Sequence, residues 1–260
     1  MSAPAAEHVQ QGQPPGVPPL ALTGERTLPD VPAENYWFRR HLVVYRWIAA
    51  RCAALEVADL ACGEGYGAAA LAERAARVVG VDANPEAHEH ARLKYTGPRL
   101  GFVRELVERF SEPVDAAVFL QTIEHVEDPA GLLAHVRGLL RPGGVAYVST
   151  PNVITLAPPG VERSDNPWHL REYRAEEFRA LCADAFARVE LLGLYHARRL
   201  RAHELALRLG WDRLHPRLGL TKRFYDRFTP AISERDFALR AEAEGADLDR
   251  ALDFLAVLRP

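Results

Sequence analysis

The chain has 260 residues, of which 48% are hydrophobic, and its formal net charge is −3. This length and composition predict one globular domain with a full hydrophobic core. The slightly acidic balance, with no evident basic stripe, argues against nucleic acid and against an anionic membrane surface as partners.

Targeting signals and cysteine chemistry are also missing from the sequence. No apolar run reaches the ~18 residues that a membrane span needs. The first twenty residues lack the basic and apolar regions of a secretory signal. Cys52, Cys62 and Cys182 form no close pair, which argues against a disulfide framework or a zinc motif. We therefore expect a cytoplasmic protein.

The beginning of the chain differs in composition from the rest. Residues 1–24 are rich in Pro, Gln, Gly and Ala, so we expect a disordered tail. Residues 25–260 are expected to form a single domain. Its first part, residues 25–52, reads as an N-terminal cap helix because ENYWFRRHLVVYRWIAARC places apolar residues at helical spacing.

Short apolar runs and helical segments then alternate along the chain. Asn84 and Asp128 are each followed by proline, a signal for the start of a helix. The alternation predicts an α/β fold with a mostly parallel sheet. The expected strands are residues 55–60, 78–81, 116–120, 145–149, 189–194 and 252–258.

Residues 196–249 interrupt this alternation with segments that are predicted to be helical and are rich in arginine and aromatic residues. They form a helical insertion before the last strand. Two interpretations stay open: a substrate lid, or a structural flap or dimer contact.

A glycine cluster directly follows the first expected strand, in the text VADLACGEGYG. Gly63, Gly65 and Gly67 permit a tight turn and close approach of a ligand to the N-terminus of the next helix. Asp82, at the end of the second strand, is placed to accept hydrogen bonds from ribose hydroxyls. The pattern predicts a nucleoside-bearing cofactor. Because Gly63, Gly65 and Ala68 also fit GxGxxG/A, an NAD-dependent oxidoreductase stays an alternative.

The sequence downstream of Asp82 narrows the choice of cofactor. VDAAVFLQTIEHVEDP ends the fourth strand, and LLRPGGVAYVSTPN supplies a turn and the next strand. Over roughly residues 24–195 the chain resembles class I S-adenosylmethionine-dependent methyltransferases, in particular the type 11 or ubiquinone-biosynthesis-like group. The resemblance implies a Rossmann-like, doubly wound, mostly parallel seven-stranded sheet with helices on both faces.

The same resemblance implies S-adenosylmethionine as cofactor and names its binding residues. In this sequence they are Asp59, Ala61, Gly63, Gly65, Asp82, Ala83 and Gln121. Ala61 stands where the family usually has its first glycine. The usual acidic residue that contacts adenine has no clear counterpart, and Glu105 is the candidate.

Some relatives, including ubiquinone O-methyltransferases and small-RNA 2′-O-methyltransferases, carry ExxEH after the fourth strand, which resembles a divalent-metal site. By this resemblance Glu124, His125 and a later histidine, His169, would hold Mg²⁺ or Mn²⁺. Such an ion lowers the pKa of a substrate hydroxyl. Glu124 and His125 are the catalytic candidates. Alternatively, His125 acts as a general base without metal, or both residues only shape the loop.

The acceptor is indicated by the flanking text. GERTLP, ENYWFRRH and SDNPWHLREY resemble bacterial methyltransferases of glycan and polysaccharide synthesis, including actinobacterial ones. We therefore expect O-methylation of a saccharide; a quinone, a lipid, another natural product or a protein stays an alternative, as does a non-catalytic binding protein. Tyr36, His41 and Tyr45 on the cap helix are substrate candidates, with core packing as the alternative, whereas His88 and His90 are expected to be solvated. The oligomeric state stays open.

Overall fold

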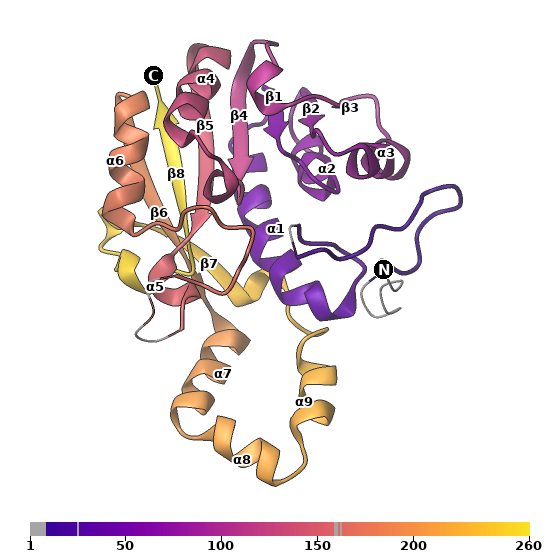
Figure 1. The fold of residues 1–260 in the computed structure, drawn as a ribbon, viewed down its shortest axis with the longest axis vertical. Coiled ribbons are helices and arrows are strands. Elements are labelled where there is room, and N and C mark those ends of the chain that lie inside the picture. Colours follow the sequence, from indigo (N-terminus) through magenta and orange to yellow (C-terminus); the bar gives the residue numbers. More distant parts are fainter. Residues whose placement is uncertain (1–8, 25, 159–160, 162) are drawn as a thin grey trace.

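The computed structural model describes residues 9–24, 26–158, 161 and 163–260. Within them, eight strands form one sheet in the order β3-β2-β1-β4-β5-β8-β6-β7 (Figure 1). The strands are β1 (Glu56–Leu60), β2 (Arg77–Val81), β3 (Leu100–Val103), β4 (Val114–Leu120), β5 (Leu140–Pro151), β6 (Arg188–His196), β7 (Phe237–Ala241) and β8 (Asp253–Arg259).

Five neighbouring strands, from β3 to β5, run parallel to one another. β8 inserts antiparallel between β5 and β6, so β5 and β6 point the same way. β7 pairs antiparallel with β6 at the sheet edge. The mostly parallel Rossmann-like sheet is confirmed, but the count of seven is wrong: β7 is an eighth strand within residues 196–249, which we expected to be helical.

Helices cover both faces of the sheet, as expected. α1 (Asn35–Ala49) and α2 (Tyr66–Ala72) pack on one face, and α4 (Pro129–Leu139) and α6 (Ala175–Ala185) pack on the other (Figure 1). α3 (Pro85–Lys94) lies beside β3, and the short α5 (Val153–Leu156) follows β5. No helix among the described residues is long and apolar enough to cross a membrane.

Asn84 and Asp128 are the N-cap residues of α3 and α4, as the sequence predicts. Asn84 Oδ1 accepts hydrogen bonds from the backbone N–H groups of Glu86 and Ala87, each at 3.0 Å. Asp128 Oδ1 accepts from the N–H of Gly131 at 2.9 Å. These bonds satisfy donors that have no partner inside the helix, which fixes where α3 and α4 begin.

The segment before α1 follows a defined path over the body, so the predicted disordered tail is wrong for residues 9–24; residues 1–8 lie outside the described residues. Val17 and Leu20 are buried, and Val9 pairs with Ala21. The amide of Gln10 donates to Glu64 Oε1 at 3.0 Å. A few apolar side chains and one buried amide therefore anchor a segment whose average composition is typical of disorder.

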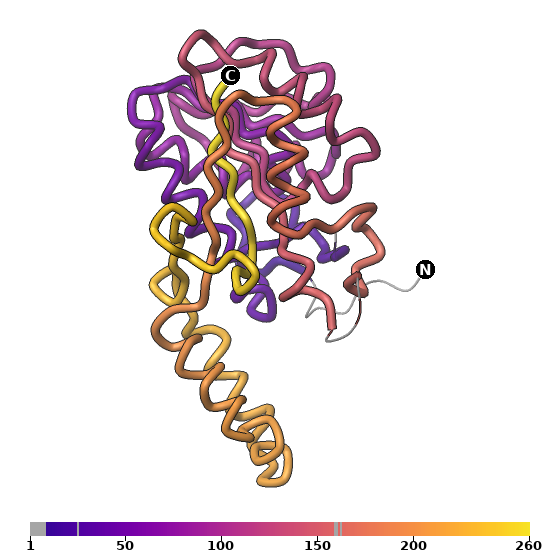
Figure 2. The backbone as a smooth tube through the Cα atoms, turned by 90° about the vertical axis from the view of Figure 1, so that its left-hand side faces the viewer, coloured from indigo at the N-terminus to yellow at the C-terminus, as the bar shows by residue number. Residues whose placement is uncertain are grey.

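Residues 198–231 form a helical arm that projects from the body (Figures 1 and 2). The arm contains α7 (Arg198–Arg208), α8 (Trp211–Arg217) and α9 (Thr221–Phe228). The side chain of Asn35 donates to the carbonyls of Thr229 and Ile232 at 2.8 and 3.0 Å. The base of the arm is thereby tied to α1.

Candidate active site

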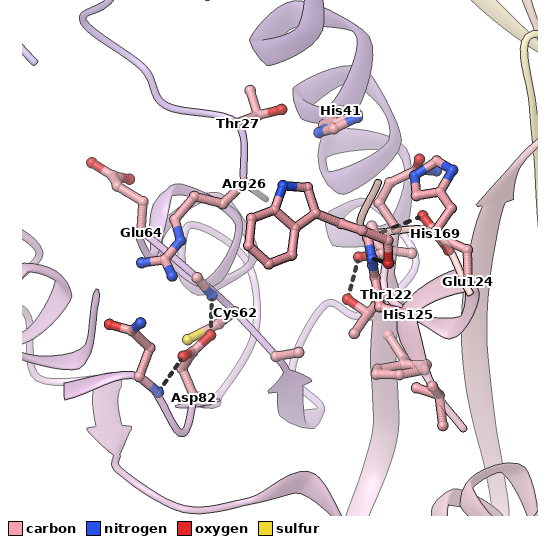
Figure 3. A pocket seen from close by; sticks show the side chains of 18 of the residues that line it. Arg26, Thr27, His41, Cys62, Glu64, Asp82, Thr122, Glu124, His125 and His169 are labelled. Carbon is pink, nitrogen blue, oxygen red and sulfur yellow. Dashed lines mark hydrogen bonds and ion pairs between the residues drawn. The ribbon is translucent and has the colours of Figure 1, made fainter. Parts of the chain in front are cut away.

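The candidate site lies where the strand order reverses, between β1 and β4, at the carboxyl ends of the parallel strands. Ligands bind at this position in open α/β sheets. A cavity of about 970 Å³ opens there, lined by residues of the glycine loop, α1, the loops after β2, β3 and β4, and residues 166–170. Figure 3 shows Cys62 and Asp82 on one side of it and Glu124, His125 and His169 on the other.

The glycine loop after β1 has the backbone that its sequence predicts. Ala61 has φ of 56°, Gly63 of 54° and Gly65 of 97°, and Gly65 caps α2. Ala61 therefore holds, at some steric cost, the left-handed conformation that glycine adopts freely. A Cβ on Gly63 would meet no atom within 4 Å, so that face of the loop is open toward the cavity.

Asp82, at the end of β2, links two backbone segments. Its Oδ2 accepts from the N–H of Gly63 at 2.7 Å, and its Oδ1 accepts from the N–H of Asn84 at 2.9 Å. Asp82 and Ala83 both line the cavity. The carboxylate is thus held in place beside the glycine loop, where two further lone pairs are available to ribose hydroxyls.

Asp59 is fully buried on β1 and only partly satisfied. Tyr45 donates its hydroxyl to Oδ1 at 3.2 Å, whereas Oδ2 has no hydrogen-bond partner among the described residues. Burial raises the pKa of Asp59 to about 8. A buried carboxyl group at the base of the loop would attract a cationic group bound above the loop, such as the amino group of the expected cofactor. Asp59 and Gly65 support the loop without lining the cavity themselves.

Gln121 lies directly after β4 and lines the cavity in a strained conformation, with φ of 52°. Its backbone N–H and its side-chain amide both donate to Ser149 Oγ, at 3.1 and 3.0 Å. These bonds fix the side chain near the loop. A non-glycine residue in the left-handed region is costly, and such residues cluster at functional sites.

Glu124, His125 and His169 come together as the sequence predicts. One ligand atom from each lies within 4.8 Å of the others. His125 Nδ1 lies 2.7 Å from the carbonyl oxygen of Trp168, and His169 Nδ1 lies 2.7 Å from Glu172 Oε1. Because a carbonyl and a carboxylate only accept, each Nδ1 carries the proton and Nε2 is the acceptor atom of each ring. In His169 this atom accepts from the side-chain amide of Asn166 at 3.0 Å, so a cation bound there would replace that hydrogen bond.

This donor set fits a divalent cation. It combines one carboxylate with two imidazoles, and in metal sites the second nitrogen of a ligating histidine donates to a carbonyl or carboxylate, as both histidines do here. Glu124 is buried, and burial raises its pKa to about 8. Its Oε2 accepts from the hydroxyl of Thr150 at 3.1 Å.

The three candidates on α1 have different surroundings. His41 and Tyr45 line the cavity, and burial lowers the pKa of His41 to about 4. Tyr36 does not line it: its hydroxyl lies 2.8 Å from Nε2 of His196, and its ring packs against Phe237. Helix geometry explains the difference, because Tyr36 lies on the side of α1 that faces β6 and β7.

Several lining residues were missed by the sequence analysis. Leu106, Val107 and Glu108 line the cavity after β3, whereas Glu105 does not. Because β2 and β3 are parallel and Asp82 follows β2, the sequence could have indicated that the residues after β3 also line the cavity. Glu108 replaces Glu105 as the candidate for the acidic residue that contacts adenine. Other polar and aromatic lining residues that were missed include Arg26, Thr27, Glu34, Trp37, Asn166 and Trp168.

His90 was expected to be solvated but is fully buried. Its Nε2 lies 2.9 Å from Glu64 Oε1, and its Nδ1 lies 2.7 Å from the carbonyl of Pro18. Glu64 also accepts from Lys94 and Tyr95. The N-terminal segment covers this face of α3, a contact that helix periodicity alone does not reveal.

The sheet, the glycine loop with Asp82 and the strained Gln121 define a Rossmann-like methyltransferase. Residues 58–148 match the family model described as "Methyltransferase domain". The chain is 38% identical over 253 residues to a protein of Mycobacterium tuberculosis named "Probable S-adenosylmethionine-dependent methyltransferase", covering 93% of this chain and 90% of that protein. A relative of the same description from Mycolicibacterium smegmatis is 40% identical, with 93% and 96% covered. The chain belongs to the S-adenosylmethionine-dependent methyltransferases, and the oxidoreductase alternative is wrong.

More distant comparisons agree on the fold. A "Ubiquinone biosynthesis O-methyltransferase" of Xylella fastidiosa is 35% identical over 102 residues, which are 37% of this chain and 42% of that protein. The solved structure of an S-adenosylmethionine-dependent methyltransferase of Thermotoga maritima superposes with a TM-score of 0.58 at 15% identity, covering 87% of this chain and 93% of that one. The [4+2]-cyclase SpnF shares the fold with a TM-score of 0.52 at 18% identity, covering 98% and 88%. Function must therefore be argued from the site.

Proposed function

We propose that this chain is an O-methyltransferase that methylates a hydroxyl group of a saccharide or polysaccharide precursor. The observation that carries the proposal is that the glycine loop and the Glu124–His125–His169 cluster line the same cavity. One wall fits the cofactor and the other carries groups that activate a hydroxyl. When bound, the sulfonium of S-adenosylmethionine supplies the methyl group.

The cofactor wall would work by positioning. Gly63 would leave room for the methionine end, the buried Asp59 would stabilise the cationic amino group from beneath the loop, and Asp82 would accept from the ribose. Positioning of this kind is worth on the order of 7–11 kcal/mol of the barrier in well-aligned reactions.

The opposite wall would raise the reactivity of the acceptor oxygen. An alcohol needs its proton removed or its acidity raised before it attacks a methyl group. His125 is the candidate base, because its Nδ1 proton is held by the carbonyl of Trp168 and the basic atom is Nε2. Alternatively, Nε2 of His125 would bind a cation instead of a proton: Glu124, His125 and His169 would then hold Mg²⁺ or Mn²⁺, which would act as a Lewis acid toward the hydroxyl.

The aromatic side chains of the cavity favour a saccharide. Trp37 and Trp168 both line the cavity and are exposed. An exposed indole face attracts the weakly positive C–H face of a sugar ring. Glu34 and Asn166 line the same space and supply hydrogen-bonding groups for sugar hydroxyls.

Transfer of radiolabelled methyl groups to a panel of oligosaccharides tests the proposal. We expect labelling of a saccharide, loss of turnover in excess EDTA, and restoration by Mg²⁺ or Mn²⁺. Glu124→Gln should lower turnover by about 100-fold or more, whereas Glu127→Gln, on the exposed neighbour, should not change it. Full turnover in EDTA would eliminate the metal, and labelling of no saccharide would eliminate the acceptor class.

A phenolic acceptor is the second candidate, and the similarity to ubiquinone biosynthesis O-methyltransferases favours it. The same assay with catechols and quinols separates the two. Labelling of a phenol without any saccharide would keep O-methylation and replace the acceptor.

A further inference from the structure

The helical arm, residues 198–231, differs from the rest of the chain in charge. Nine of its residues are arginine or lysine and three are aspartate or glutamate, which gives a net charge of +6 in a chain whose total is −3. The average over the whole chain conceals this segregation. The expectation that the sequence has no basic surface is wrong for the arm.

Most of the basic side chains of the arm have no acidic partner. Within the described residues, no ion pair or side-chain hydrogen bond involves the guanidinium groups of Arg201, Arg208, Arg213, Arg217, Arg223 and Arg227, all of which are exposed. Of the acids, Glu204 pairs with His196 and Asp226 pairs with Lys222. The arm thus keeps a positive field that nothing in this part of the protein neutralises.

Exposed leucines lie among these arginines. Leu209 is 80% exposed and Leu218 is 57% exposed, and Leu205 and Leu214 are exposed as well. Residues four apart share one side of a helix, so Leu214 on α8 and Leu218 at its C-cap lie on one side, next to Arg213 and Arg217. Apolar and basic stripes side by side are typical of helices that lie at a membrane surface.

Aromatic side chains fill the inner side of the arm. His203 on α7 stacks on Phe224 of α9, and Trp211 packs edge-on against Phe224. Beside this cluster, a groove of about 420 Å³ is lined by Phe224, Phe228 and Leu220 together with Arg199, Arg223 and Arg227. The arm therefore has a half-buried aromatic cluster of its own, and its exposed leucines are not part of that packing.

We propose that the arm docks on the surface of an acidic lipid bilayer, with its leucines in the headgroup region and its arginines on lipid phosphates. A nucleic acid would also attract the arginines, but it offers no apolar medium for Leu205, Leu209, Leu214 and Leu218. A second copy of this chain would bring a second arm of the same charge, which disfavours arm-to-arm pairing.

The position of the arm connects docking to the cavity. The arm leaves the sheet at the end of β6 (Figure 1). Because β6 points the same way as β4 and β5, the arm starts at the sheet edge where the cavity opens. Its base is tied to α1 by Asn35 and by the ion pair of Arg39 with Glu234, and α1 contributes His41 and Tyr45 to the cavity. Docking would therefore place the cavity close to molecules carried at the bilayer surface.

Co-sedimentation of the full chain with vesicles tests the proposal. We expect binding to phosphatidylglycerol vesicles that weakens with added salt, and little binding to phosphatidylcholine vesicles. Arg213→Glu with Arg217→Glu should lower the partition coefficient at least about 25-fold, because each basic residue near the bilayer contributes a factor of about five. Leu209→Gln with Leu218→Gln, which leaves the charge unchanged, should lower it at least about tenfold.

A matched control has the same change in charge at another place. Arg92→Glu with Arg250→Glu alters two exposed arginines of the body and should leave the partition coefficient within about twofold. Circular dichroism and binding of S-adenosylhomocysteine, unchanged in all variants, would show that the fold is intact.

Four results would overturn the proposal. The first is a wild-type chain that stays in the supernatant with acidic vesicles. The second is an equal loss of binding in the arm and body charge variants. The third is tight binding of an oligonucleotide without binding of vesicles. The fourth is a dimer in light scattering that Leu209→Gln with Leu218→Gln dissociates, without any binding of vesicles.

Discussion

The hydroxyl of Tyr45 donates a hydrogen bond to Oδ1 of Asp59 at 3.2 Å, and both side chains are buried. The contact joins the cap helix α1 to β1 immediately before the glycine loop. Oδ2 of Asp59 has no partner among the described residues. Because water is excluded around this pair, the charge of Asp59 is weakly screened. The glycine loop above it is therefore sensitive to whether Asp59 is ionised.

We expect the affinity for S-adenosylmethionine to rise with pH up to about 8. Burial raises the pKa of Asp59 to about 8, so the carboxyl of the free protein is largely protonated at neutral pH. A cationic amino group bound at the loop above Asp59 favours the ionised form, so binding releases a proton below that pH. Calorimetry in buffers of different ionisation enthalpy measures both the affinity and the proton release. In Asp59→Asn the affinity should fall and the pH dependence should disappear; a pH slope that persists in this variant would contradict the assignment.

The same raised pKa predicts how stability depends on pH. The folded-state pKa of Asp59 lies above the unfolded value of 3.8, so the folded protein binds more protons than the unfolded one between these values. The favourable contribution of Asp59 to the free energy of unfolding is therefore complete below the unfolded pKa, and it is lost as pH rises through about 8. Urea unfolding at several pH values should show a flatter profile in Asp59→Asn than in the wild type. If stability depended on pH in the same way in both proteins, ionisation of Asp59 would not lower the free energy of unfolding.

Gly67 gives a second link between the loop and α1. A Cβ at this position would lie 2.2 Å from Cζ of Tyr45, inside the buried ring. Gly67→Ala should therefore destabilise the protein by about 1–3 kcal/mol and weaken cofactor binding, because the ring must shift. Gly138→Ala on α4 is the control: no atom lies within 4 Å of its Cβ, and it should stabilise by about 0.4–1 kcal/mol. Equal midpoints for the two variants in urea would contradict the close contact.

Glu172 orients His169 from outside the proposed metal cluster. Its Oε1 accepts from Nδ1 of His169 at 2.7 Å, and its Oε2 accepts from the N–H of Ser164 at 2.8 Å. Removing a carboxylate of this kind costs about 10–100-fold in metal affinity. We expect Glu172→Gln to raise the Mn²⁺ concentration for half-maximal activation by that factor, while Glu176→Gln, whose side chain is 84% exposed, leaves it unchanged. Identical activation curves for both variants would argue against metal on His169.

A buried ion pair ties α1 to the last strand. Arg40 donates through Nε and a terminal nitrogen to the two oxygens of Asp253, at 2.7 and 2.6 Å. Asp253→Asn leaves the guanidinium buried without its counter-charge and should cost about 3–5 kcal/mol in urea unfolding. Arg40→Met combined with Asp253→Leu should cost less than Asp253→Asn alone. A double variant that is less stable than the single one would show that the charges themselves stabilise the fold.

Much of the fold could be predicted because its signals are local. Asn84 and Asp128 cap their helices with their own side chains, and the glycine loop needs left-handed backbone at particular positions. The site could be placed because the strands before Asp82 and Gln121 are parallel, which brings their ends to one edge.

The features that were missed depend on contacts between distant residues. Val17 and Leu20 are buried only because the body offers them a surface, and His90 is buried only because Glu64 and Pro18 cover it. β7 is half-buried at a sheet edge and forms only where β6 is available to pair. No local pattern contains these partners.

The most direct test of the central claim is a crystal structure with S-adenosylhomocysteine and Mn²⁺ bound. We expect the nucleoside against Asp82 and the loop of Gly63, and anomalous density for manganese at Glu124, His125 and His169, all within one cavity. A nucleoside bound elsewhere, or manganese absent from this cluster in the presence of the bound product, would contradict it.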